Sequence, residues 1–112
     1  DSKWALLPIV DIARIYSLKN KIPATNTLER LARLHERDVF STPRYKDIVH
    51  AYTFLMTQRF RRQAAMLARN AAADNLIETH ALSEVDMLVL RRVLSQIEDF
   101  QSKLSLDFKG TI

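Results

Sequence analysis

The scarcity of glycine and proline is the feature that most restricts how this chain can fold. One glycine and three prolines occur in 112 residues, far below average usage, and sheet-rich folds need many such residues in their tight turns. Hydrophobic residues make up 47% of the chain, which supplies enough apolar material for a core and argues against disorder. The length fits one domain of ordinary size. We therefore predict a single all-α domain over residues 1–112.

Hydrophobic spacing and capping residues predict the first two helices. Pro8 occupies a position that a helix start tolerates, and apolar residues follow at helical intervals from Ile9 to Tyr16. Asn26 with Glu29 three residues later forms the pattern of a capping box, so we expect a second helix to begin there. The predicted inner face of this second helix consists of Leu28, Leu31, Ala32 and His35.

Two further helices follow from the same signals. Ser41 or Thr42 as the cap, with Pro43 in the first turn, predicts a third helix that reaches about residue 69 and is roughly 40 Å long. Ser83 and Asp86 cap a fourth helix, and residues 70–82 form a loop whose alanines at 71–73 could prolong the third. The apolar face of the fourth helix consists of Val89, Leu90, Val93, Leu94, Ile97, Phe100 and Leu104. We predict an antiparallel helical bundle of four to five helices with one long central helix.

The inventory of reactive residues excludes most enzyme classes for this segment alone. Gly110 is the only glycine, so a phosphate-binding loop or a dinucleotide fingerprint cannot be built. Cysteine is absent, no serine stands in a nucleophile elbow, and the three histidines lie on different predicted elements without a metal-binding pattern. We predict no catalytic residue, no metal ligand and no cofactor in this segment. The lack of cysteine fits a cytoplasmic protein, and no apolar run approaches the length of a membrane span.

Arg59 and Gln63 are the polar residues that the helical pattern makes unusual. On a wheel of the third helix, both fall near the middle of an apolar stripe that runs from Tyr45 toward Leu67. A guanidinium that faces a core needs a partner. Either Arg59 pairs with an acidic residue such as Asp11 or Asp86, or the bundle opens here into a cleft where Arg59 and Gln63 meet a phosphate or carboxylate.

Other surface residues support weaker hypotheses. Arg14 lies at the border of the first helix's apolar face, and an ion pair with Asp11 is the simpler interpretation. Arg61 and Phe54 are predicted to lie on the far side of the third helix, where Phe54 could contact a neighbouring domain. A net charge of +4 with acidic residues interspersed is too weak to establish nucleic-acid binding. An exposed apolar patch made of Phe54, Leu88, Leu106 and Phe108 would instead indicate a protein-interaction or dimerisation bundle.

Several sequence blocks, taken in their order and spacing, resemble one known family. They are residues 6–14 (LLPIVDIAR), residues 26–31 (NTLERL), residues 54–56 (FLM) followed by Arg59 and Gln63, and then residues 75–77 with Leu82 and Ser83. This arrangement resembles the C-terminal helical nucleotidyltransferase substrate-binding domain of bacterial signal-transduction proteins. Where that family tends to have Asp-Pro after the position of Ile77, this chain has Glu78 and Thr79.

The resemblance implies a function that periodicity does not show. In such proteins a nucleotidyltransferase domain similar to the uridylyltransferases of the PII protein precedes the helical domain, and cyclic-nucleotide-binding and CBS domains usually precede both. Magnesium, nucleotide and the catalytic carboxylates would belong to that upstream domain. Arg14, Arg30, Arg59 and Gln63 match the family's polar positions and are the expected substrate-binding residues. Because the chain starts at Asp1 and not at Met, we expect it to be excised from the C-terminus of a larger protein.

Overall fold

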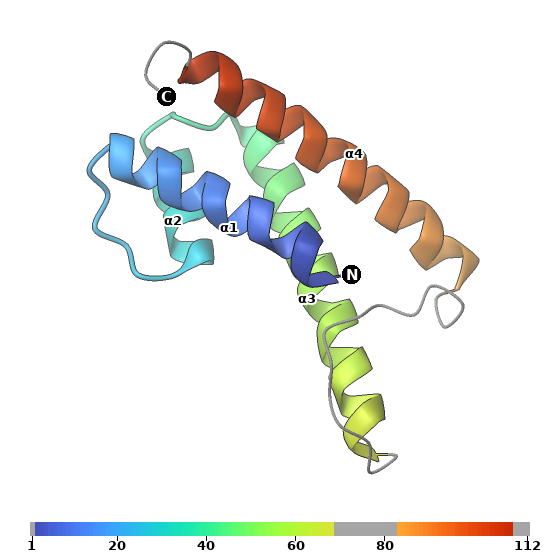
Figure 1. Ribbon diagram of the computed structural model, residues 1–112. Helices are drawn as coiled ribbons and strands as arrows, with labels where there is room; N and C mark the ends of the chain where they lie inside the picture. The colour runs from blue at the N-terminus through green and yellow to red at the C-terminus, as the bar shows by residue number, and fades with distance from the viewer. Residues whose placement is uncertain (1, 69–82, 109–112) are drawn as a thin grey trace.

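Four helices and no strand make up the described part of the chain, which comprises residues 2–68 and 83–108, with side chains from Leu6 onward in the first helix. In this computed structural model the helices are α1 (Ser2–Lys19), α2 (Thr27–Glu36), α3 (Thr42–Ala68) and α4 (Glu84–Asp107). Figure 1 shows α1 lying across α2 and α3, with α4 along the other side of α1, while the last turns of α3 project beyond the other helices. The predicted all-α bundle with one long helix is confirmed.

The helix starts confirm the predicted caps. Asn26 Oδ1 accepts the backbone N–H of Glu29 at 2.9 Å, and Asn26 Nδ2 donates to Glu29 Oε2 at 3.5 Å. Ser41 Oγ accepts from Arg44 N–H at 3.3 Å at the start of α3, and Ser83 Oγ accepts from the N–H of Asp86 at 3.0 Å at the start of α4. The bonds from the backbone N–H groups of Glu29, Arg44 and Asp86 satisfy donors that the first turn of a helix leaves without an intrahelical acceptor.

The ends of α1 and α2 show how a chain with so little glycine terminates helices. Lys21 and Asp38 both adopt the left-handed conformation, with φ of 55° and 59°. After each, a backbone N–H bonds back to the carbonyl five residues earlier, from Ile22 to Ser17 and from Val39 to Leu34. This geometry is usual for glycine, because a side chain in the left-handed region costs roughly 1 kcal/mol.

The prediction that the first helix starts at Pro8 is wrong. α1 begins at Ser2, and Pro8 lies inside it. Proline in a helix interior removes one backbone hydrogen bond. The helix nevertheless continues on both sides because its apolar face, including Leu6, Ile9 and Ile12, is buried in the core.

Two predicted inner faces are rotated relative to the structure. In α2 the buried residues are Thr27, Leu31 and Leu34, whereas Leu28 is 47% exposed. In α3 the buried residues are Ile48, Ala51, Leu55 and Gln58. Gln58, at 6% exposure, therefore occupies the polar position on the buried face that the wheel assigned to Arg59, and Arg59 is half-buried beside it.

The core is built around α1 and α3, each of which contacts the other three helices. An aromatic cluster closes one end of it. Tyr16 makes edge contacts with Phe40 and Phe108 at ring-centroid distances of 5.0 and 5.3 Å, and Phe40 makes one with Phe100 at 5.6 Å. Phe108 is thus buried, and Phe54 is half-buried against the core, so neither belongs to the exposed patch that the sequence suggested. Leu88 and Leu106 are exposed as predicted.

Residues 2–68 and 83–108 contain no helix that could cross a membrane. None of the four helices combines the length and the apolar character needed to span a bilayer.

Candidate functional site

The residues predicted to bind substrate lie on three helices. Arg14 is exposed on α1, Arg30 is half-buried on α2, and Arg59 and Gln63 are half-buried one turn apart on α3. Arg59 and Gln63 each take part in at least one polar, ionic or ring contact. The ion pairs among the described residues do not join Arg14 to Asp11.

Arg61 faces α4 and not the far side of α3. Its Nη1 lies 4.0 Å from Asp86 Oδ2 at the start of α4. Asp86, one of the two acidic residues that the sequence suggested for Arg59, therefore has Arg61 as an ion-pair neighbour. Arg61 is 67% exposed, so this pair contributes little stability.

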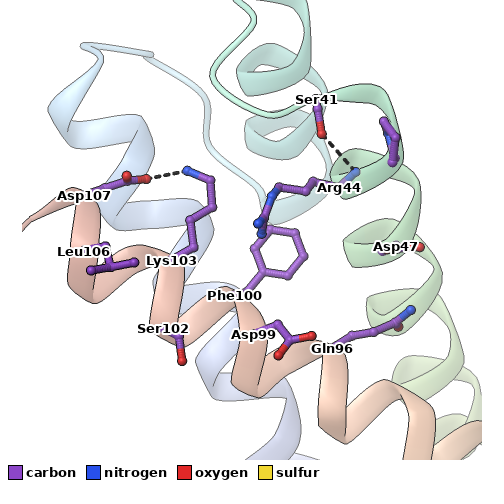
Figure 2. A pocket seen from close by; sticks show the side chains of 11 residues that line it. Ser41, Arg44, Asp47, Gln96, Asp99, Phe100, Ser102, Lys103, Leu106 and Asp107 are labelled. Carbon is purple, nitrogen blue, oxygen red and sulfur yellow. Dashed lines mark hydrogen bonds and ion pairs between the residues drawn. The ribbon is translucent and has the colours of Figure 1, made fainter.

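A groove of about 660 Å³ lies between the first turns of α3 and the last three turns of α4. Figure 2 shows that its side chains come from both helices and meet over Phe100. None of Arg14, Arg30, Arg59 and Gln63 lines it. The lining residues are Ser41, Pro43, Arg44, Asp47, Gln96, Asp99, Phe100, Ser102, Lys103, Leu106 and Asp107.

Arg44 is the cation at the centre of the groove. The cap by Ser41 fixes the turn that carries it, and its guanidinium carbon lies 5.5 Å from the centre of the Phe100 ring. Within residues 2–68 and 83–108, the ion pairs are Arg33 with Glu29, Arg61 with Asp86 and Lys103 with Asp107. None of them includes Arg44, so its donors can bind an anionic group of a ligand.

Carboxyl and amide groups lie farther along the groove. Asp47 comes from α3, and Gln96 and Asp99 come from α4 (Figure 2). Gln96 Oε1 is shielded from solvent and has no hydrogen-bond donor among the described residues. Buried carbonyl oxygens are normally paired, so a turn of this carboxamide toward the groove would let a ligand hydroxyl or amine donate to it.

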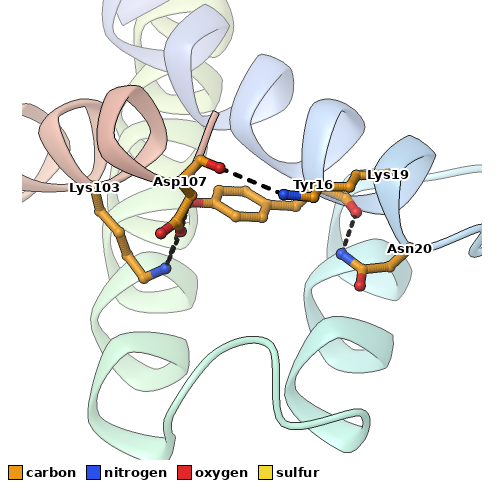
Figure 3. A network of polar contacts seen from close by, with 5 residues as sticks. All are labelled: Tyr16, Lys19, Asn20, Lys103 and Asp107. Carbon is orange, nitrogen blue, oxygen red and sulfur yellow. Dashed lines mark hydrogen bonds and ion pairs between the residues drawn. The ribbon is translucent and has the colours of Figure 1, made fainter. Parts of the chain in front are cut away.

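The other end of the groove is held by a polar network around Asp107 (Figure 3). The Tyr16 hydroxyl donates to Asp107 Oδ2 at 2.5 Å, and Lys103 forms an ion pair with the same oxygen. Lys19 Nζ donates to the backbone carbonyl of Asp107 at 3.4 Å. The network joins the ends of α1 and α4 and thereby fixes one wall of the groove.

The electrostatics of this network follow from burial and hydrogen bonding. The hydrogen bonds from Lys103 and Tyr16 lower the pKa of Asp107 below its ordinary value. Burial, and then the hydrogen bond to Asp107, raise the pKa of Tyr16 above its ordinary value. Asp107 is therefore ionised and Tyr16 is protonated at neutral pH, and the charge of Lys103 is largely offset by Asp107.

Sequence reasoning missed this groove. Arg44 and Lys103 have no unusual place in a periodic pattern, and the two segments that carry them meet only in the folded chain.

The residues that the structure describes contain no group of three histidine, aspartate or glutamate side chains that could hold a metal ion.

Comparison with known proteins identifies the family. A family model described as "Putative nucleotidyltransferase substrate binding domain" matches residues 2–108. No curated protein and no solved structure matches the chain. Because the family model covers nearly the whole chain, the chain belongs to the family of nucleotidyltransferase substrate binding domains.

Proposed function

We propose that this helical domain binds the substrate of a nucleotidyltransferase domain upstream in the same chain and completes its cleft. The groove between α3 and α4 is the observation that carries this proposal. Its volume of about 660 Å³ falls within the range of roughly 300–1,000 Å³ that small-molecule sites occupy. Its central guanidinium is positioned by an aromatic ring and stands outside the ion pairs of the described residues.

The finer parts of the proposal extend the family assignment. We place the domain in a bacterial, cytoplasmic signal-transduction protein whose catalytic domain is similar to the PII uridylyltransferases, with CBS and cyclic-nucleotide-binding domains upstream. Magnesium and the nucleotide would bind to the catalytic domain, which carries the chemistry. Arg14, Arg30, Arg59 and Gln63 are then candidate contacts to that domain or to a substrate that it shares with the groove.

Kinetics of the full-length protein test this proposal. Arg44→Gln is expected to raise KM for the acceptor substrate roughly 10–100-fold, because a hydrogen bond to a charged group contributes about 1.5–3 kcal/mol. Arg59→Ala is expected to lower kcat/KM without unfolding the protein. Arg92→Gln is the matched control, since Arg92 is exposed on α4 outside the groove. Unchanged kinetics in both Arg44→Gln and Arg59→Ala would rule out a substrate-binding role for these residues.

A protein-interaction bundle is the second candidate function. The observation that favours it is the exposure of large apolar side chains in the second half of α3 and the first turns of α4. Phe60 is 66% exposed and Leu67 is 70% exposed on α3, and Val85 and Leu88 are exposed on α4. Light scattering of the 112-residue chain over a range of concentrations tests it. Self-association that Phe60→Asp abolishes would support this function, whereas a monomer at every concentration would exclude dimerisation.

A further inference from the structure

The groove separates its charges along its length. Along α4, Gln96 and Asp99 precede Phe100, and Lys103 and Asp107 follow it (Figure 2). Asp99 and Lys103 are about 6 Å apart along the helix axis at 1.5 Å per residue. Because Lys103 is paired with Asp107, the positive charge left for a ligand is that of Arg44. On the other side of Arg44 from Lys103 and Asp107, the groove presents oxygen acceptors.

Arg44 is suited to one oxyanion. A guanidinium offers a planar fork of donors that matches phosphate or carboxylate oxygens. Its position over the Phe100 ring and its half-buried state hold the fork in place. The Arg44 side chain therefore loses less conformational entropy when a ligand binds than a freely moving arginine would.

The acceptor end limits the rest of the ligand. Asp47 and Asp99 would repel a second anionic group, but they accept hydrogen bonds from hydroxyls. Carboxylates commonly bind the hydroxyls of a sugar in this way, as the acidic residue of a dinucleotide site does with ribose. The carboxamide of Gln96, whose last torsion is soft, adds a further polar partner at this end. A fitting ligand thus carries one anionic group and several hydroxyls.

We infer that the groove binds the phosphate ester of a polyol, with the phosphate on Arg44 and the hydroxyls on Asp99, Asp47 and Gln96. This inference rests on the proposed function, because it assigns a ligand class to the same groove. A nucleoside monophosphate and a free sugar phosphate share this chemistry. The groove is large enough for either.

Titration of the isotopically labelled 112-residue chain, followed by NMR, tests the inference. The probes are AMP, ribose 5-phosphate, ribose and inorganic phosphate. AMP and ribose 5-phosphate, the two esters, are expected to shift the amide signals of residues 41–47 and 96–107 until the site is saturated. Ribose and inorganic phosphate, which each carry only part of an ester, are expected to bind at least about tenfold more weakly. Tighter binding of AMP than of ribose 5-phosphate would identify a nucleotide as the source, and equal binding would identify a sugar phosphate.

Three variants assign the contacts. Arg44→Gln is expected to weaken both esters about tenfold or more. Asp99→Asn keeps an acceptor but loses the charge, and is expected to weaken ribose-containing probes several-fold without weakening inorganic phosphate. Arg92→Gln, outside the groove, is expected to bind as the unmodified chain does. The helical circular dichroism and Tm of each variant verify that it is folded.

The inference is overturned if neither ester shifts the groove signals, or if folded Arg44→Gln binds the esters as the unmodified chain does. Its failure is distinguishable from failure of the proposed function. If the esters do not bind but Arg44→Gln still raises KM in the full-length protein, the groove takes a substrate of another class. If the esters bind but no groove variant changes transfer, the site exists without the proposed role in transfer.

Discussion

Replacing Tyr16 with phenylalanine would remove a single hydroxyl while leaving the buried ring in place. Tyr16 is 2% exposed, and its ring packs by its edge against Phe40 and Phe108. The substitution creates no large cavity, because only one oxygen is lost. Its main effect is to delete the 2.5 Å hydrogen bond to Asp107 Oδ2.

The expected loss in the free energy of unfolding is about 1 kcal/mol. A hydrogen bond to a charged group contributes roughly 1.5–3 kcal/mol. The Asp107 side chain is 37% exposed and keeps its ion pair with Lys103, so water and the ammonium replace part of what the phenol provided. For a domain of this size, about 1 kcal/mol corresponds to a decrease in Tm of roughly 4 °C.

The loss should depend on pH with a definite sign. Lys103 and Tyr16 lower the pKa of Asp107 in the folded state, so its stabilisation is present above the unfolded pKa of about 4 and disappears as the pH falls through the folded pKa. The difference in free energy of unfolding between Tyr16→Phe and the unmodified chain therefore becomes smaller at acidic pH. At alkaline pH the relevant group is Tyr16, whose pKa is raised in the folded state. Its contribution to the free energy of unfolding is complete below its unfolded pKa of about 10, and it is lost as the pH rises through its folded pKa.

Urea unfolding followed by far-UV circular dichroism measures these differences. Asp107→Asn and the double variant complete a thermodynamic cycle, and a coupling free energy of about 1 kcal/mol is expected at neutral pH. The reasoning is refuted if Tyr16→Phe is as stable as the unmodified chain at neutral pH. An equal loss at neutral and at strongly acidic pH would also refute it, because the effect would then not involve the Asp107 carboxylate.

Three further substitutions test the packing, capping and helix-end arguments, each by urea unfolding. Phe40→Ala is expected to lower the free energy of unfolding by about 3–5 kcal/mol, since Phe40 is 1% exposed. Leu18→Ala, at an exposed position, is the control and should change the free energy of unfolding little. Equal losses in the two variants would contradict the assignment of Phe40 to the core. Asn26→Ala should cost about 1 kcal/mol through the lost cap, and no change would mean that the cap is not formed. Lys21→Gly should stabilise the chain by up to about 1 kcal/mol because it relieves a left-handed residue, so a clear loss would contradict that geometry.

Features determined within a few residues were predictable from the sequence. Asn26, Ser41 and Ser83 were recognised as caps because the bond from each side chain reaches a backbone N–H only three residues away. Pro8 was misread for a related reason. A local rule describes where proline is tolerated, whereas burial of residues on both sides of Pro8 keeps α1 continuous through it.

The orientation of a helix about its axis was less predictable. A wheel gives the angle between residues, about 100° per step, but neighbouring helices decide which face is covered. The buried face of α3 consequently includes Gln58 and not its neighbour Arg59, which the wheel had placed there. The groove was beyond local patterns altogether, because Arg44 and Phe100 lie on different helices and meet only when α3 packs against α4.

The central position of α1 also determines when the core can be completed during synthesis. Tyr16 meets Asp107 across 91 residues of sequence, and α4 supplies Val93, Ile97 and Phe100 to the core. The ribosome makes α1, α2 and α3 first, so the apolar faces that α4 later covers are open on the nascent chain. Exposed apolar surface of this kind is what chaperones bind and what leads to aggregation. Among the four described helices, α4 is made after the other three, and its packing is what covers these apolar faces.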